Sequence, residues 1–196
     1  MDYKLLAEQI GKAIEQRPGD VEAYRDLFSL CRDQEGTDFE AAHRLNKELR
    51  GKCAQQLRVV SPTEGEAFYE QWRRCLLFDA PHDFDSFMLY LELDRKPDKR
   101  FYAPRRHYLK PMVQGFQDVL DGKLRLLTIS MPKRAGKSQT GINFVNMLSG
   151  KFPDRSTLME GTGDDLVKSF YTGFADPQRV SILRCVPRGQ AGADQR

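Results

Sequence analysis

Residues 124–138 read LRLLTISMPKRAGKS, and this stretch decides the predicted fold. Residues 124–130 are apolar enough for a buried strand, and Ile142, Val145 and Leu148 then recur at helical spacing. A strand, a loop that ends in Gly-Lys-Ser and a helix are the context that a phosphate-binding loop requires. We therefore expect an α/β fold, in which a helical N-terminal region is followed by the start of a P-loop NTPase sheet, incomplete and of the ASCE type.

The residue types at the end of this loop suit phosphate chemistry. Gly136 lets the backbone approach a ligand closely, Lys137 would bridge the β- and γ-phosphates, and the Ser138 hydroxyl would bind Mg²⁺. Backbone N–H groups of the loop and the positive end of the following helix would face the β-phosphate. Met131 stands where the standard pattern has glycine, so the loop departs from the usual motif.

The loop resembles the glycine-poor Walker A loop of the large terminase subunits of tailed bacteriophages, through residues 132–138. The resemblance also includes the segment FYAPRR at residues 101–106 and extends over roughly residues 84–175. It implies an ATPase and endonuclease motor that packages double-stranded phage DNA. It also implies a portal protein and a small terminase subunit as partners, the cytoplasm of a bacterial host as location, no membrane, and homo-oligomers of the full-length protein.

The resemblance assigns roles to individual residues, with ATP and Mg²⁺ as the cofactors. Arg134 would be the catalytic extra cation that senses the γ-phosphate, with Lys133 as the alternative. Tyr102 and Arg106, or Arg105, would lie beside the adenine, although ordinary packing and surface charge explain these residues equally well. Ser138 would hold the magnesium ion. The residues expected to contact ATP in the loop are Lys133, Arg134, Ala135, Gly136, Lys137, Ser138 and Gln139.

A Walker B segment, an apolar run that ends in paired acids, does not follow residue 138 in the sequence. Residues 87–94 are apolar with single acids, precede the loop, and are predicted to form an amphipathic helix. We therefore expect the ATP-binding portion of a terminase, truncated before Walker B and the nuclease domain. Such a chain would bind nucleotide weakly without turning it over.

Charge divides the chain into two halves. Residues 1–94 hold 12 basic and 19 acidic side chains, for a charge of −7, whereas residues 95–196 hold 19 basic and 9 acidic, for +10. We expect a helical region over 1–94, a basic linker over 95–106, a partial P-loop ATPase domain over 107–176 and a disordered tail over 177–196. A second strand is expected at residues 156–159, followed by a helix over 166–171.

Helix signals are clear before the loop. Breaks at residues 18–20 and 34–37 separate the first helices, and Asp38 is a candidate cap for the next one. Residues 61–64, Ser-Pro-Thr-Glu, predict a capping box at the start of another helix. Further helices are predicted over residues 84–93 and 107–120, the second closed by Asp121 and Gly122.

Other readings stay open beside the terminase hypothesis. Residues 1–94 could be a helical protein-interaction module that carries a vestigial P-loop segment, or the chain could be another P-loop NTPase, helicase-like or a small kinase. The basic half could also bind DNA directly. The four cysteines form no Cys-x-x-Cys pair, which favours packed free thiols in a reducing compartment over a zinc site. No apolar run suits a signal peptide or a membrane span.

Overall fold

The structure is a computed structural model that describes residues 2–160, 164, 167 and 168. Every regular element in these residues is a helix, so the expected α/β fold is wrong. Packing divides the chain into an N-terminal unit, Met1–Asp79, and a C-terminal unit, Ala80–Arg196. Residues 95–106, expected to be a linker, therefore lie inside the second unit.

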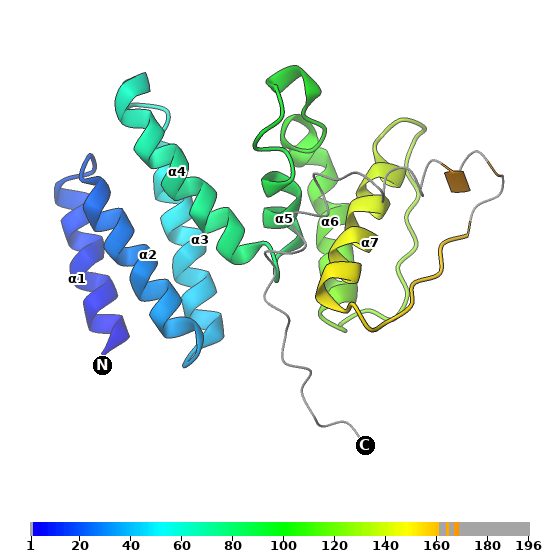
Figure 1. The fold of residues 1–196 in the computed structure, drawn as a ribbon, viewed down its shortest axis with the longest axis horizontal. Coiled ribbons are helices and arrows are strands. Elements are labelled where there is room, and N and C mark those ends of the chain that lie inside the picture. Colours follow the sequence, from blue (N-terminus) through cyan, green and yellow to red (C-terminus); the bar gives the residue numbers. More distant parts are fainter. Residues whose placement is uncertain (1, 161–163, 165–166, 169–196) are drawn as a thin grey trace. The chain divides into compact units, whose positions relative to one another are not determined.

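The N-terminal unit contains four helices: α1 (Tyr3–Gln16), α2 (Val21–Glu35), α3 (Phe39–Gln56) and α4 (Pro62–Asp79). Consecutive helices run in opposite directions, as Figure 1 shows. The expected caps are confirmed, because Asp38 Oδ1 accepts from the N–H of Ala41, and Glu64 Oε2 accepts from the N–H of Ser61. Side-chain oxygens thus satisfy N–H groups that have no partner within a helix.

A compact core holds the N-terminal unit together. The Tyr24 ring packs edge-to-face on the Phe68 ring, with centroids 5.1 Å apart, and both side chains are buried. Leu49 and Cys53 of α3 lie in the same core and are fully buried. Because α2, α3 and α4 all contribute side chains, this unit has a core of its own.

The C-terminal unit is also built from helices. They are α5 (Phe84–Tyr90), two short 3₁₀ turns, η1 (Pro97–Lys99) and η2 (Ala103–Arg105), then α6 (Arg106–Leu120) and α7 (Lys137–Lys151). Helices α5, α6 and α7 pack on one another (Figure 1). The ring of Phe84 meets those of Phe116 and Phe144 at 5.8 and 5.3 Å, which joins the three helices at an aromatic cluster.

The two expected strands are absent from the described residues. Residues 124–130 and 156–159 run without regular structure, although their apolar content indicated strands. Leu126 and Leu158 are 82% and 83% exposed, whereas Leu127 packs against the backbone of Gly115 on α6. An apolar run favours an extended chain, but a strand also needs a hydrogen-bonding neighbour, and none lies beside these runs in the described part of the chain.

The last predicted elements are only partly described. Residues 164, 167 and 168 are helical, in and near the segment expected to be a helix. The tail expected over 177–196, and most of residues 166–171, lie outside the described residues.

Candidate functional site

The loop before α7 has an unusual backbone. Gly136 lies just before the helix with φ +102°, and Arg134 has φ +66°, both in the left-handed region. Glycine takes this conformation freely, whereas for arginine it is disfavoured. The N–H of Ala135 donates to the Pro132 carbonyl at 3.3 Å, which closes a turn. The predicted loop thus has a defined shape even though no strand precedes it.

The start of α7 presents its polar groups to solvent. Lys137 and Ser138 form the first turn and are exposed, as are Lys133 and Arg134 in the loop. No described side chain caps this end of the helix. The first N–H groups of a helix have no partner within it and carry the positive end of its dipole. An anion could therefore accept hydrogen bonds here, with basic side chains nearby in sequence.

The remaining loop residues are less accessible. Ala135, Gly136 and Gln139 are half-buried, and Gln139 Nε2 donates to Asn143 Oδ1 at 3.3 Å. Thr140 is buried, and its hydroxyl donates to the Gly136 carbonyl at 3.0 Å. These contacts hold the first turn of α7 together. Of the residues expected to bind ATP in the loop, four are thus exposed and three are half-buried.

Tyr102 and Arg106, expected beside the adenine, both bind the carboxylate of Asp85 on α5. The Tyr102 hydroxyl donates to Asp85 Oδ1 at 2.6 Å, and Arg106 makes two hydrogen bonds of 2.7 and 2.8 Å to the same carboxylate. Burial, then the bond to Asp85, raises the pKa of Tyr102 well above its ordinary value. Hydrogen bonding to Asp85 raises the pKa of Arg106. Arg106 thus joins α5 to the start of α6, and Tyr102 joins α5 to the segment just before η2.

Glu92 makes a second anchor for the same segment. Its carboxylate accepts from the N–H groups of Phe101, Tyr102 and Ala103, at distances from 2.7 to 3.0 Å. Glu92 is only 4% exposed, so these hydrogen bonds satisfy a buried charge. Glu92 belongs to residues 87–94, which were predicted to form an amphipathic helix. That helix is confirmed only as far as Tyr90, because α5 spans Phe84–Tyr90 and residues 91–94, including Glu92, form turns.

The anchored segment reaches the loop through an aromatic ring. The Phe101 ring lies so close to Gly136 that a Cβ on this glycine would be 2.6 Å from Phe101 Cζ. The Arg105 guanidinium lies over the same ring, 5.4 Å from its centroid. The structure thus brings together the two motifs that the sequence analysis singled out, residues 101–106 and 131–138.

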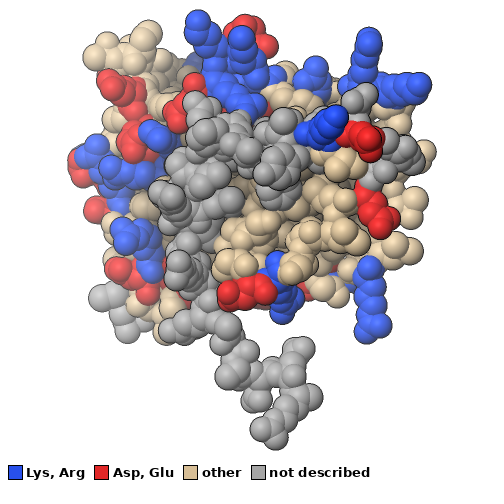
Figure 2. All heavy atoms as spheres, turned by 45° about the vertical axis from the view of Figure 1, so that its right-hand side comes forward, with Lys and Arg blue, Asp and Glu red and all other residues tan. Residues whose placement is uncertain are grey.

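Basic side chains of the C-terminal unit have different surroundings. Lys96, Lys99 and Lys110 are exposed, whereas Arg100 donates to the carbonyls of Arg95 and Leu93. Where Figure 2 shows the surface, Lys and Arg side chains are interspersed with Asp and Glu. At least one basic side chain of residues 95–106, that of Arg100, therefore stabilises the fold through hydrogen bonds to the backbone.

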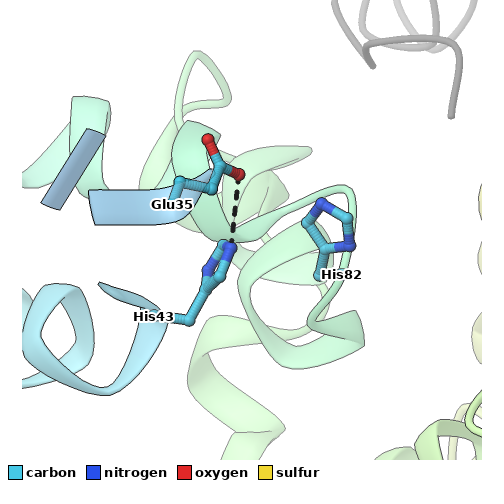
Figure 3. Close-up of side chains that lie close together, drawn as sticks. All are labelled: Glu35, His43 and His82. Carbon is cyan, nitrogen blue, oxygen red and sulfur yellow. Dashed lines mark ion pairs between the residues drawn. The ribbon is translucent and has the colours of Figure 1, made fainter. Parts of the chain in front are cut away.

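A buried polar cluster in the N-terminal unit was not foreseen. His43 Nδ1 lies 2.7 Å from Asp79 Oδ1, and His43 Nε2 lies 3.5 Å from Glu35 Oε1, the ion pair dashed in Figure 3. Asp79 is fully buried, and Arg50 lies 3.6 Å from its second oxygen. Phe78 stacks on His43 at 4.6 Å. Positions 43 and 79 are 36 residues apart, so no local pattern connects them.

The three described cysteines, Cys31, Cys53 and Cys75, are free and buried. Burial raises the pKa of the Cys31 thiol to about 12, and contact with the Cys53 thiol followed by burial raises that of Cys75 further. Such thiols remain protonated at neutral pH and are poor nucleophiles and metal ligands. The expectation of packed free thiols is confirmed for these three positions.

Comparison with known proteins adds no relative: no family model, no curated protein and no solved structure matches the chain. Within the described residues, no helix combines the length and apolar character needed to cross a membrane.

Proposed function

We propose that the loop over residues 131–138 and the first turn of α7 bind ATP with Mg²⁺. The observation that carries the proposal is the start of α7, where exposed Lys137 and Ser138 follow a left-handed Gly136 and no described side chain caps the helix. Lys137 would contact the β- and γ-phosphates, and Ser138 would bind the magnesium ion. The loop and the N-terminus of α7 carry both side chains, together with the N–H groups of the first helical turn, so this mode of phosphate binding does not require a β-sheet.

The proposal extends, on the resemblance in sequence, to the large terminase subunit of tailed phages. In that role Arg134, or Lys133, would sense the γ-phosphate, and Arg105 or its neighbours would lie near the base. The wider partners would be double-stranded phage DNA, a portal protein and a small terminase subunit, in the cytoplasm of a bacterial host. Of these proposed properties, nucleotide binding can be measured directly on this chain.

The test is titration of the chain with Mg²⁺ and a fluorescent N-methylanthraniloyl ATP. We expect Lys137→Ala to weaken binding by at least about tenfold, because a charge-assisted contact to phosphate is lost. Ser138→Ala should remove the dependence on Mg²⁺. Lys123→Ala, which deletes the same charge at an exposed lysine of the same unit, should change binding by less than about twofold. Absence of binding to folded wild-type protein would refute the proposal.

A second candidate function, protein interaction, concerns the N-terminal unit. Helices α1, α2 and α3 line a groove of about 700 Å³, with Ala7, Gly11 and Ala41 among its walls. A Cβ on Gly11 would meet no atom within 4 Å, so this position has open space for a side chain, and Gly11→Leu should narrow the groove. If the groove binds a terminase partner, calorimetry with the small subunit or the portal protein should show binding that Gly11→Leu abolishes. If Gly11→Leu left partner binding unchanged, the groove would be excluded as the binding site.

A further inference from the structure

We propose that Glu92 is a positioning residue for the loop over residues 131–138, and that it acts through Phe101. The inference rests on the proposed function, because it concerns the shape of that same nucleotide-binding loop. Glu92 itself would not touch the ligand. Its side chain is buried, and both of its oxygens are engaged by backbone N–H groups.

The first step is the hold of Glu92 on residues 101–103. Three consecutive N–H groups donate to its carboxylate, two of them at 2.7 Å. Hydrogen bonds to an ionised acceptor are shorter and stronger than those between neutral groups. Asp85 binds the Tyr102 hydroxyl and the Arg106 guanidinium, so residues 101–106 are held near their start and at their end.

The second step is the contact of Phe101 with the loop. The ring occupies the space beside Gly136, where an added Cβ would lie 2.6 and 2.8 Å from two ring carbons. Leu109 closes the same space, with Cδ1 3.7 Å from that position. The ring therefore restricts movement of the Gly136 backbone. Since Gly136 immediately precedes Lys137, its conformation sets the direction of the first N–H groups of α7.

The test begins with Glu92→Gln. The Gln amide would place an NH₂ group against backbone N–H donors, so residues 101–103 lose an acceptor while the side chain keeps its size. We expect about tenfold weaker binding of Mg²⁺ and N-methylanthraniloyl ATP, because the loop is no longer held in its binding geometry. Simple electrostatics predicts the opposite sign, since removing a negative charge should favour phosphate. Glu160→Gln, at an exposed glutamate of the same unit, is the matched control and should leave binding unchanged.

A double-mutant cycle with Phe101→Leu tests the route. If Glu92 acts through Phe101, then Glu92→Gln should not weaken binding further in the Phe101→Leu background. Multiplied effects of the two substitutions would overturn the proposal, because Glu92 would then act by another route.

Amide hydrogen exchange without nucleotide separates this inference from the proposed function. Glu92→Gln should raise exchange in peptides over residues 131–140 and leave peptides of α1–α3 unchanged. If wild-type protein binds no nucleotide, the proposed function fails, yet the exchange result still decides whether Glu92 holds the loop. Unchanged exchange at 131–140 in a folded variant would overturn the positioning role. If Glu92→Gln does not fold, Phe101→Leu must raise exchange at 131–140, and failure to do so would overturn it equally.

Discussion

The helices of the N-terminal unit begin on side chains that cap them, whereas two long helices of the C-terminal unit do not. Asp2, Asp20 and Asp38 accept hydrogen bonds from the first turns of α1, α2 and α3, and Ser61 with Glu64 caps α4. Helices α6 and α7 begin without a described side-chain cap. Each of these caps satisfies one N–H donor at the start of its helix, whereas no described side chain does so at the exposed start of α7.

The two units also use buried carboxylates differently. Asp79 in the N-terminal unit binds two side chains, His43 and Arg50. Glu92 in the C-terminal unit binds backbone N–H groups of an irregular segment. The contacts of Asp79 join packed helices. The hydrogen bonds of Glu92 satisfy backbone N–H groups that have no partner within a helix, and so fix the conformation of an irregular segment.

The largest effect that we predict is a loss of folding stability in the N-terminal unit, and it tests whether this unit has a core independent of the C-terminal unit. A fragment of residues 1–79 should fold alone and unfold cooperatively in urea, because its core is built from its own helices. Leu49→Ala should lower its free energy of unfolding by about 2–5 kcal/mol, since Leu49 is fully buried. Leu5→Ala, at a side chain 53% exposed, is the control. A fragment without a cooperative transition would contradict the division into two units.

Alkaline pH should act on the same core through Tyr24. Burial raises the pKa of Tyr24 from 10.0 to about 12, so the unfolded chain releases this proton first. Stability that is fully present below pH 10 should then fall as pH rises to 12, by roughly 2–3 kcal/mol. Tyr24→Phe removes the hydrogen bond to the Pro18 carbonyl at every pH below 10, but its free energy of unfolding should not show the fall between pH 10 and 12 that titration of Tyr24 causes. Parallel stability curves for the two proteins between pH 9 and 12 would contradict the prediction.

In the C-terminal unit, Arg106→Ala should lower the free energy of unfolding by about 1–3 kcal/mol, because the Asp85 carboxylate loses two charge-assisted hydrogen bonds. Asp85→Asn should lower the free energy of unfolding less in the Arg106→Ala protein than in wild type. Chemical denaturation of wild type, the two single variants and the double variant would measure this difference. Lys110→Ala, at an exposed lysine, should remain within about 0.5 kcal/mol of wild type. Additive effects of the first two substitutions would mean that this pair does not join α5 to α6.

The sequence predicted what depends on neighbours in the chain. The cap at Asp38 and the capping box at Ser61 and Glu64 act across three residues, so their side-chain types are sufficient to identify them. The left-handed backbone of Gly136 before α7 was not predicted, because the sequence indicated only that this glycine lets the backbone approach a ligand. Capping signals are local, and these predictions were confirmed.

Contacts between distant residues could not be predicted in this way. The apolar run at 124–130 indicated a strand, but pairing depends on a second segment that no local signal supplies. The hydrogen bonds from residues 101–103 to Glu92 span nine to eleven positions, and the pair of His43 and Asp79 spans 36. Single acids in a predicted amphipathic helix are common on surfaces, so nothing marked Asp85 as a half-buried anchor or Glu92 as a buried one.

The smallest expected effect tests the correction to the fold. Leu126→Ser should change the free energy of unfolding by less than about 0.5 kcal/mol, because this side chain is 82% exposed. Leu127→Ser should cost about 1–2 kcal/mol, because Leu127 packs on Gly115 of α6. The two variants make the same chemical change at adjacent positions, so their difference reports which side of residues 124–130 is covered. Equal and large losses of stability would require both sides to be buried, as in a central strand of a sheet, and would contradict the irregular, half-exposed course of residues 124–130.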